Sequence, residues 1–212
     1  MVDNGSTDNT AQVCAAAGVR RIPVELPGIA AATARGFDEA RSAVIARLDA
    51  DSIPPTDWLE RLETILGDAG PLAAVSGPGA FYGGTRFARW MGHSVWIPGY
   101  VWAVGLLLGH PPLFGSNFAM RVDVWEQIRG AVHRGKPAVH DDLDISYQIP
   151  PGVSVIWEPT LVVGVSSRPF ESWHAAGRRL AMAWTTFAVD FRDESPLRRR
   201  RRRKRWERAQ RR

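Results

Sequence analysis

The sequence predicts an α/β fold in which a mixed, mostly parallel sheet is flanked by helices, and two observations predict it. Short apolar runs alternate with longer Ala-rich or amphipathic segments, which is typical of strands and helices that follow one another around a sheet. Paired acids follow directly on the apolar run 43–48, and sheets of this class bind ligands at the carboxyl ends of their strands. The length of 212 residues fits one domain.

The first part of the chain shows this alternation from its start. A polar, turn-rich loop precedes a helix that begins at Thr10 and ends at Gly18, because glycine readily adopts the backbone conformation that closes a helix. Two prolines stand before residues 56–66 and favour a helix there. The other elements predicted in this part are strands at 19–26 and 43–48 and a helix at 29–42.

The second part contains one ambiguous segment. Residues 86–110 are rich in tryptophan and favour either an amphipathic helix or a loop. The apolar part of this segment is shorter than the ~20 residues that cross a bilayer, so it can touch a membrane but not span one. The other predicted elements are strands at 72–78 and 114–121, a helix at 124–129, two strands within 153–165 and a helix at 173–191.

The positive charge is concentrated at one end of the chain. Residues 198–212 hold ten arginines and one lysine against Glu207, a net charge of +10, whereas residues 1–197 carry a net charge of −5. A nucleic-acid-binding fold spreads its cations over one face, so we expect no nucleic-acid partner. We predict a folded domain over 1–194 and a basic, disordered tail over 195–212 that is either solvated or bound to an anionic membrane.

The sequence favours a cytoplasmic protein. Cys14 is the only cysteine, so no disulfide forms within the chain and a reducing compartment is the simpler assumption. A polar segment follows Met1 in place of a basic start and an apolar stretch, and no signal peptide is visible. The basic tail is able to hold such a protein at the inner face of the membrane.

The best single candidate for a chemical site is the pair Asp49 and Asp51. These carboxylates come just after a predicted strand, and Mg²⁺ or Mn²⁺ prefers oxygen ligands, which one or two carboxylates and a diphosphate supply together. Aspartate is also common in turns and at helix starts. On its own, the pair is therefore equally compatible with a metal site and with a solvated turn.

Two further segments carry polar groups. Three acids lie within four residues at Asp141, Asp142 and Asp144, which indicates a bound cation, a general base or solvent exposure. Leu143 and Ile145 alternate with them, which suggests that some of the acids share one face. The loop at residues 2–10 offers hydroxyls and carboxylates to a nucleobase or ribose, although a surface turn has the same composition.

Taken in order, these segments resemble the successive signatures of the family 2 glycosyltransferases. The matching segments are Val2 to Asp8, Arg47 to Ser52 ahead of Trp58-Leu59, Gly115 to Asn117 and His140 to Asp144. Four short motifs in the right order and spacing are far more specific than any one of them. The resemblance implies the A-type nucleotide-diphospho-sugar fold, a Rossmann-like sheet, with residues 1–194 as its catalytic domain.

The resemblance also implies roles for individual residues. Asp142 is the base that deprotonates an acceptor hydroxyl, so that the sugar is transferred from a nucleoside diphosphate with inversion, and Asp51 binds the divalent cation, Mn²⁺ or Mg²⁺. The acceptor is a carbohydrate or a lipid-linked molecule. The residues implied on the donor side are Asp3, Asn4, Asp49, Gly115, Ser116 and Asn117, and those on the acceptor side are Asp141 and Asp144.

Some features depart from the family pattern. Asp141 stands where the family more often has glutamate, Ala34 replaces a usual asparagine, and the Gln-x-x-Arg-Trp signature of processive members is absent, so polymer synthesis is not expected. The strand and the Pro-x-x-Asn-Glu-like loop that normally precede the motif at Asp3 are also missing, so we expect an N-terminally truncated domain with an exposed sheet edge. Two alternatives follow: an inactive paralogue that binds a membrane or partner, and a nucleotidyltransferase.

Overall fold

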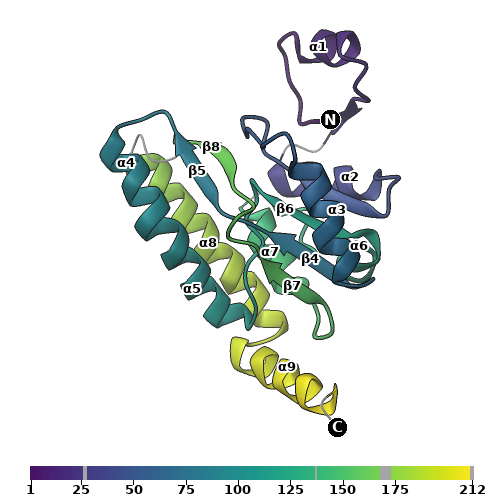
Figure 1. The fold of residues 1–212 in the computed structure, drawn as a ribbon, viewed down its shortest axis with the longest axis vertical. Coiled ribbons are helices and arrows are strands. Elements are labelled where there is room, and N and C mark those ends of the chain that lie inside the picture. The colour runs from purple at the N-terminus through teal and green to yellow at the C-terminus, as the bar shows by residue number, and fades with distance from the viewer. Residues whose placement is uncertain (26–27, 137, 168–172, 211–212) are drawn as a thin grey trace.

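The computed structural model describes residues 1–25, 28–136, 138–167 and 173–210. Its centre is a four-stranded sheet with the strand order β3-β6-β4-β7 (Figure 1). The strands are β3 (Val44–Arg47), β4 (Ala73–Ser76), β6 (Phe118–Arg121) and β7 (Ser154–Trp157). Strand β6 is antiparallel to both β3 and β4, while β4 and β7 are parallel. The sheet is therefore mixed, and the α/β fold class is confirmed.

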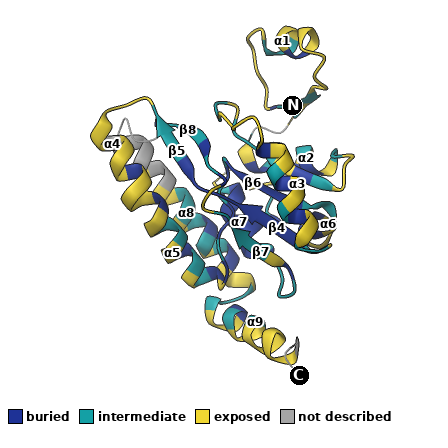
Figure 2. Ribbon diagram, in the orientation of Figure 1, coloured by how far each residue is buried: buried dark blue, intermediate teal, exposed yellow. Residues whose placement is uncertain are grey.

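Alternation along the central strands divides the core into two layers. Ala74 and Met120 belong to one buried cluster, whereas Val75 and Ala119 belong to the other, because successive side chains of a strand point to opposite faces. The first layer is covered by α2 (Ile29–Asp38) and α6 (Val122–Ile128), and the second by α3 (Trp58–Asp68). Figure 2 shows the buried sheet between helices with exposed outer faces.

Two smaller sheets flank this centre. Strands β1 (Val2–Asp3) and β2 (Ile22–Pro23) pair in parallel and lie with α1 (Thr10–Ala16) apart from the central sheet (Figure 1). Close packing against α2 holds β1, since a side chain at Gly36 would come within 2.6 Å of Val2. The second pair joins β5 (Gly79–Tyr82), which the sequence does not predict, to β8 (Val163–Ser166).

The ambiguous tryptophan-rich segment is helical. It consists of α4 (Arg86–Met91), a π-helical turn η1 (Gly92–Trp96) and α5 (Ile97–Leu108). Pro98 lies at the start of α5 and has no N–H to donate to the preceding turn, which is a common cause of such irregular turns. Helix α5 packs against α7 (Asp141–Gln148) and α8 (Trp173–Asp193) through a small apolar cluster.

The end of the chain differs from the predicted disordered tail, because residues Pro196–Gln210 form helix α9. The physical reason is Arg199, which is only 4% exposed. Its guanidinium donates to the carbonyl oxygens of Leu108 and Ile149, at 3.0 and 2.6 Å, and stacks on Tyr147. A run of arginines that looks solvated in the sequence thus has one member that holds the helix. Arg211 and Arg212 of the predicted tail lie outside the described residues.

Candidate active site

Arg47 at the end of β3 connects two of the acidic motifs. Its side chain is 13% exposed and lies 2.9 Å from Asp141 Oδ2 and 3.2 Å from Asp49 Oδ1. Burial lowers the pKa of Arg47, but the charges of Asp141, Asp142 and Asp49 outweigh it and raise that pKa. The guanidinium therefore stays charged and fixes the carboxylates of two sequence-distant segments beside each other.

The Gly-Ser-Asn segment bridges the same two motifs. Ser116 Oγ donates to Asp49 Oδ2 at 2.5 Å, and the N–H of Gly115 donates to Asp142 Oδ2 at 2.8 Å. A side chain at position 115 would lie 2.6 Å from Asp142 Oδ2 and 2.9 Å from Arg47 Nη1. Only glycine fits at position 115, because Asp142 and Arg47 lie so close to its Cα. Three motifs far apart in the sequence therefore meet at one site.

Asp142 is a buried carboxylate that is held ionised. It is 5% exposed and forms an ion pair with His140 Nδ1. Burial raises the pKa of Asp142, but His140, Arg47 and the Gly115 N–H together lower it to about 2. In turn, the charge of Asp142 raises the pKa of His140. The arrangement provides a fixed negative oxygen at neutral pH, as a general base requires.

Asp141 and Tyr100 complete the inner wall of this site. Asp141 Oδ2 also accepts a hydrogen bond from Thr33 Oγ1 of α2 at 2.6 Å. The hydroxyl of Tyr100 on α5 is buried, and it has no hydrogen-bond partner among the described residues. Burial and the charges of Asp142 and Asp141 raise the pKa of Tyr100 well above its usual value. Tyr100 therefore stays neutral beside the two acids.

Asp144 points away from Asp142. The sequence suggests that some of the acids share one face, and Asp144 is not one of those near Arg47, because the segment is helix α7, where alternate residues do not point the same way. Asp144 Oδ2 accepts the His133 N–H at 2.7 Å, and Asp144 Oδ1 lies 2.9 Å from His133 Nδ1. Asp190 of α8 lies 3.5 Å from the same imidazole nitrogen. Asp144 thus belongs to a second cluster with His133 and Asp190.

The second cluster makes stability pH-dependent. Burial, the charge of Asp144 and a hydrogen bond with it raise the pKa of Asp190 to about 9. Between about pH 4 and pH 9 the folded chain keeps a proton that the unfolded chain has released. The free energy of unfolding therefore falls as pH rises, with a limiting slope of about 1.4 kcal/mol per pH unit.

We predict that Asp190→Asn flattens this dependence and makes the protein more stable than the wild type at pH 8, since the amide needs no proton. Urea unfolding at pH 5, 6, 7 and 8 measures it. Asp123→Asn is the control, because Asp123 of α6 is an exposed acid outside this cluster. An unchanged pH slope in the Asp190 variant would show that Asp190 does not carry the proton.

The loop after β1 presents Asp3 and Asn4. Asp3 is 3% exposed; its two oxygens accept from the Ser6 N–H at 2.8 Å and from Arg21 Nε at 2.6 Å. Hydrogen bonds from Ser6 and then from Arg21 lower the pKa of Asp3 to about 2. Asn4 Oδ1 accepts from the Gly28 N–H at 3.2 Å. These contacts fix the loop through Ser6, Arg21 and the Gly28 backbone, and none of them involves Asp49 or Asp142.

Two other residues implied by the resemblance differ in their surroundings. Asp51 lies beyond β3, partly exposed, and its carbonyl oxygen accepts from Tyr82 Oη at 2.5 Å. Asn117 is completely buried. Its amide donates to the carbonyl oxygens of Pro78 and Leu161 and accepts from Trp58 Nε1 at 3.0 Å. The side chain of Asn117 therefore supports the loop from inside the core.

Two groups of side chains have the spacing of metal ligands. In the described ranges, the ligand atoms of each group lie within 4.8 Å of one another. One group is His140, Asp141 and Asp142, and the other is His133, Asp144 and Asp190. Asp51 belongs to neither group, so a cation at Asp51 would need water and ligand oxygens to complete its shell, as Mg²⁺ usually does.

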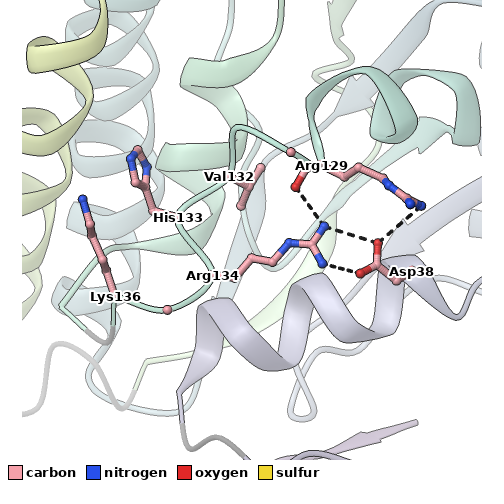
Figure 3. A pocket seen from close by; sticks show the side chains of 8 residues that line it. Asp38, Arg129, Val132, His133, Arg134 and Lys136 are labelled. Carbon is pink, nitrogen blue, oxygen red and sulfur yellow. Dashed lines mark hydrogen bonds and ion pairs between the residues drawn. The ribbon is translucent and has the colours of Figure 1, made fainter.

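A surface hollow of about 690 Å³ lies near the second cluster (Figure 3). Among the described residues, those around it include Arg129, His133, Arg134 and Lys136 and none of the predicted site residues. Asp38 forms ion pairs with both arginines, as Figure 3 shows. Two of the three Arg and Lys side chains around this hollow thus share one acid, and the hollow is separate from the site at Asp142.

Sequence reasoning assigned no role to Arg47, His140, Thr33 or Tyr100. Arg47 and His140 stand inside recognised motifs, and their adjacency to the acids was the available signal. Thr33 and Tyr100 come from helices whose faces only the fold places against the site.

Comparison with known proteins identifies the family. The family described as Glycosyl transferase family 2 matches residues 1–129, which include the first three motifs. The chain belongs to this family. No curated protein sequence matches the chain.

One solved structure confirms the fold, and two further ones are similar over part of the chain. Glucosyl-3-phosphoglycerate synthase from Mycobacterium tuberculosis in complex with uridine-diphosphate matches at 20% identity and a TM-score of 0.53, covering 89% of this chain and 67% of that one. Its complexes with phosphoglyceric acid, and with Mn²⁺ and uridine-diphosphate-glucose, match at 21% and 19% identity, both with a TM-score of 0.45. In these two comparisons, the matched region covers 76% of this chain and 57% of the synthase chain.

Proposed function

We propose that this family 2 chain transfers a sugar from a nucleoside diphosphate sugar to an acceptor hydroxyl, with inversion at the anomeric carbon. The observation that carries the proposal is the meeting of three motifs, in which Asp142 is held ionised by His140 and Gly115 while Asp49 is joined to it through Arg47 and Ser116. A carboxylate fixed beside a donor-type motif is what an inverting transfer requires.

The chemistry assigned to Asp142 is proton removal. The acceptor oxygen forms its bond to the anomeric carbon as the bond from that carbon to the diphosphate oxygen breaks, and the hydroxyl proton passes to Asp142. The Gly115 N–H holds the receiving carboxylate in place. Asp141 borders the acceptor side, and we assign to Asp144, which faces His133, a positioning role in α7.

The donor is proposed to lie along Asp3, Asn4, Asp49 and the Gly115–Ser116 turn, with Asn117 supporting that turn. The oxygen ligands of Asp49 and Asp51 fit a hard divalent cation, Mn²⁺ or Mg²⁺, and Asp51 is partly exposed at the strand end. When bound, such an ion stabilises the charge of the departing diphosphate.

The acceptor is proposed to be a carbohydrate or a lipid-linked molecule, and the protein to work on the cytoplasmic side of a membrane. Support comes from α9, whose cations are suited to anionic lipid headgroups. Because α9 is a regular helix that is attached to α5, its cations hold a fixed position at the edge of the domain.

The testing experiment is calorimetric titration with a panel of nucleoside diphosphates, with and without Mn²⁺. We predict that one diphosphate binds on the order of tenfold more tightly with Mn²⁺, and that Asp51→Asn removes this gain. Asp68→Asn, which alters an exposed acid of α3, should leave it intact. A folded chain that binds none of the panel would favour the inactive membrane- or partner-binding paralogue.

A further inference from the structure

The outer face of the helical stretch α4–η1–α5 is unusually apolar for a surface. Its large apolar side chains are between 42% and 69% exposed, and they are Phe87, Trp90, Val95, Trp96, Trp102 and Leu106. Only 22% of an 18-residue window within Arg89–Leu108 is buried. The stretch is long and apolar enough to cross a membrane, which corrects the expectation that its apolar part is too short to do so. Apolar surface of this extent marks a site for a partner or for lipid. We call these six side chains the apolar face.

The opposite side of the same stretch is packed against the domain. Tyr100, Val104 and Leu108 belong to a cluster with Tyr147 of α7 and Phe187 of α8, and Gly92 approaches so closely that a side chain there would lie 2.4 Å from the Phe81 ring. One side of the stretch is therefore packed against the rest of the domain. A helix held in this way is suited to lying in a membrane surface with its other side in the lipid.

The charges around the apolar face decide between occupants. No aspartate or glutamate occurs from residue 69 to residue 122. Helix α9 is anchored at the end of α5, where Arg199 Nε donates to the Leu108 carbonyl oxygen at 3.0 Å. Its exposed cations are Arg198, Arg201, Arg202, Lys204, Arg205 and Arg208. A second copy of the chain that docked through the same face would bring another cationic helix and few acids to balance its charge. An anionic bilayer offers an apolar layer to the side chains and a negative layer to the cations.

We propose that the apolar face inserts into the interfacial layer of an anionic bilayer while α9 lies along the lipid headgroups. Tryptophan favours this layer because its ring is apolar and its N–H is polar. The proposal goes beyond membrane contact through α9, since it assigns the main contact to α4–η1–α5.

The placement also concerns the reaction site. Tyr100, on the packed side of α5, lies in one apolar cluster with Leu143, the residue that follows Asp142, so the apolar face is about one helix diameter, ~10 Å, from the proposed base. Given the proposed transfer reaction, an acceptor hydroxyl carried by a lipid would reach Asp142 from the bilayer surface.

The test is flotation of the purified chain with phosphatidylcholine vesicles that contain or lack phosphatidylglycerol. We expect binding to the anionic vesicles, and we expect the triple variant Trp90→Gln/Trp102→Gln/Leu106→Gln, which leaves the net charge unchanged, to weaken it on the order of tenfold or more. The control is Leu59→Gln on α3, where Leu59 is 68% exposed, and it should bind like the wild type. Arg201→Ala/Lys204→Ala/Arg205→Ala should weaken binding at low salt and have less effect at high salt.

A second measurement needs no variant of the apolar face. Lipids brominated on their acyl chains should quench the tryptophan fluorescence of the wild type in anionic vesicles. The proposal is overturned if the wild type neither floats nor is quenched, if the triple variant floats as well as the wild type, or if the triple variant only converts a dimer to a monomer. Nucleotide titration without vesicles is independent of these outcomes, so failure of the proposed enzyme function is recognised separately.

Discussion

Replacing Asp142 with asparagine should lower kcat for sugar transfer by about 10²–10⁴-fold while leaving nucleotide affinity nearly unchanged. The amide keeps the shape of the carboxylate and still accepts the Gly115 N–H, but it cannot take a proton from an acceptor. The His140 imidazole loses the charge that raises its pKa and is expected to become neutral, so no uncompensated cation remains.

The measurement is the rate of nucleoside diphosphate release from the sugar nucleotide that the wild type uses, together with nucleotide binding by calorimetry. Asp57→Asn, at an exposed acid ahead of α3, is the control and should keep full activity. If Asp142→Asn retained the wild-type kcat, the base would have to be another group, and His140 would be the first to examine.

The strands and helices that the sequence predicts correctly are those whose own residues carry a clear apolar pattern. Helix α3 buries Trp58, Leu62 and Leu66 at four-residue spacing, and β4 is buried along its whole length, so a helical period and a short apolar run predict them directly. The apolar run 43–48 likewise predicts that Asp49 and Asp51 stand at the end of a strand, β3. Family membership and the α/β fold are likewise confirmed.

The features that escaped prediction depend on contacts between distant residues. Helix α7 contains three acids, and the cost of burying them is met by Arg47, His140 and His133, which only the fold brings near. Helix α9 is ordered through Arg199, whose partners lie about 50 and 90 residues away. Composition alone made both segments look solvated.

Replacing Arg47 with methionine should destabilise the domain by about 3–5 kcal/mol, because it leaves buried carboxylates without their cation. Asp141 and Asp142 are 3% and 5% exposed, so water cannot take over the role of the guanidinium, while methionine retains the aliphatic volume of the arginine stem. Urea unfolding at pH 7 measures the loss. Arg35→Met is the control: its ion pair with Glu39 is 54% exposed on the arginine side, and its loss should cost less than about 1 kcal/mol.

The double variant Arg47→Met/Asp141→Asn separates charge from packing. If the missing cation is the cause, neutralising Asp141 should restore part of the stability, with a coupling energy of about 0.5–3 kcal/mol. If the loss came from poorer packing of the methionine, the two substitutions would simply add. An Arg47→Met loss no larger than that of Arg35→Met would show that the acids are not held by Arg47. The arrangement of Asp49, Asp141 and Asp142 at the candidate site would then need another explanation.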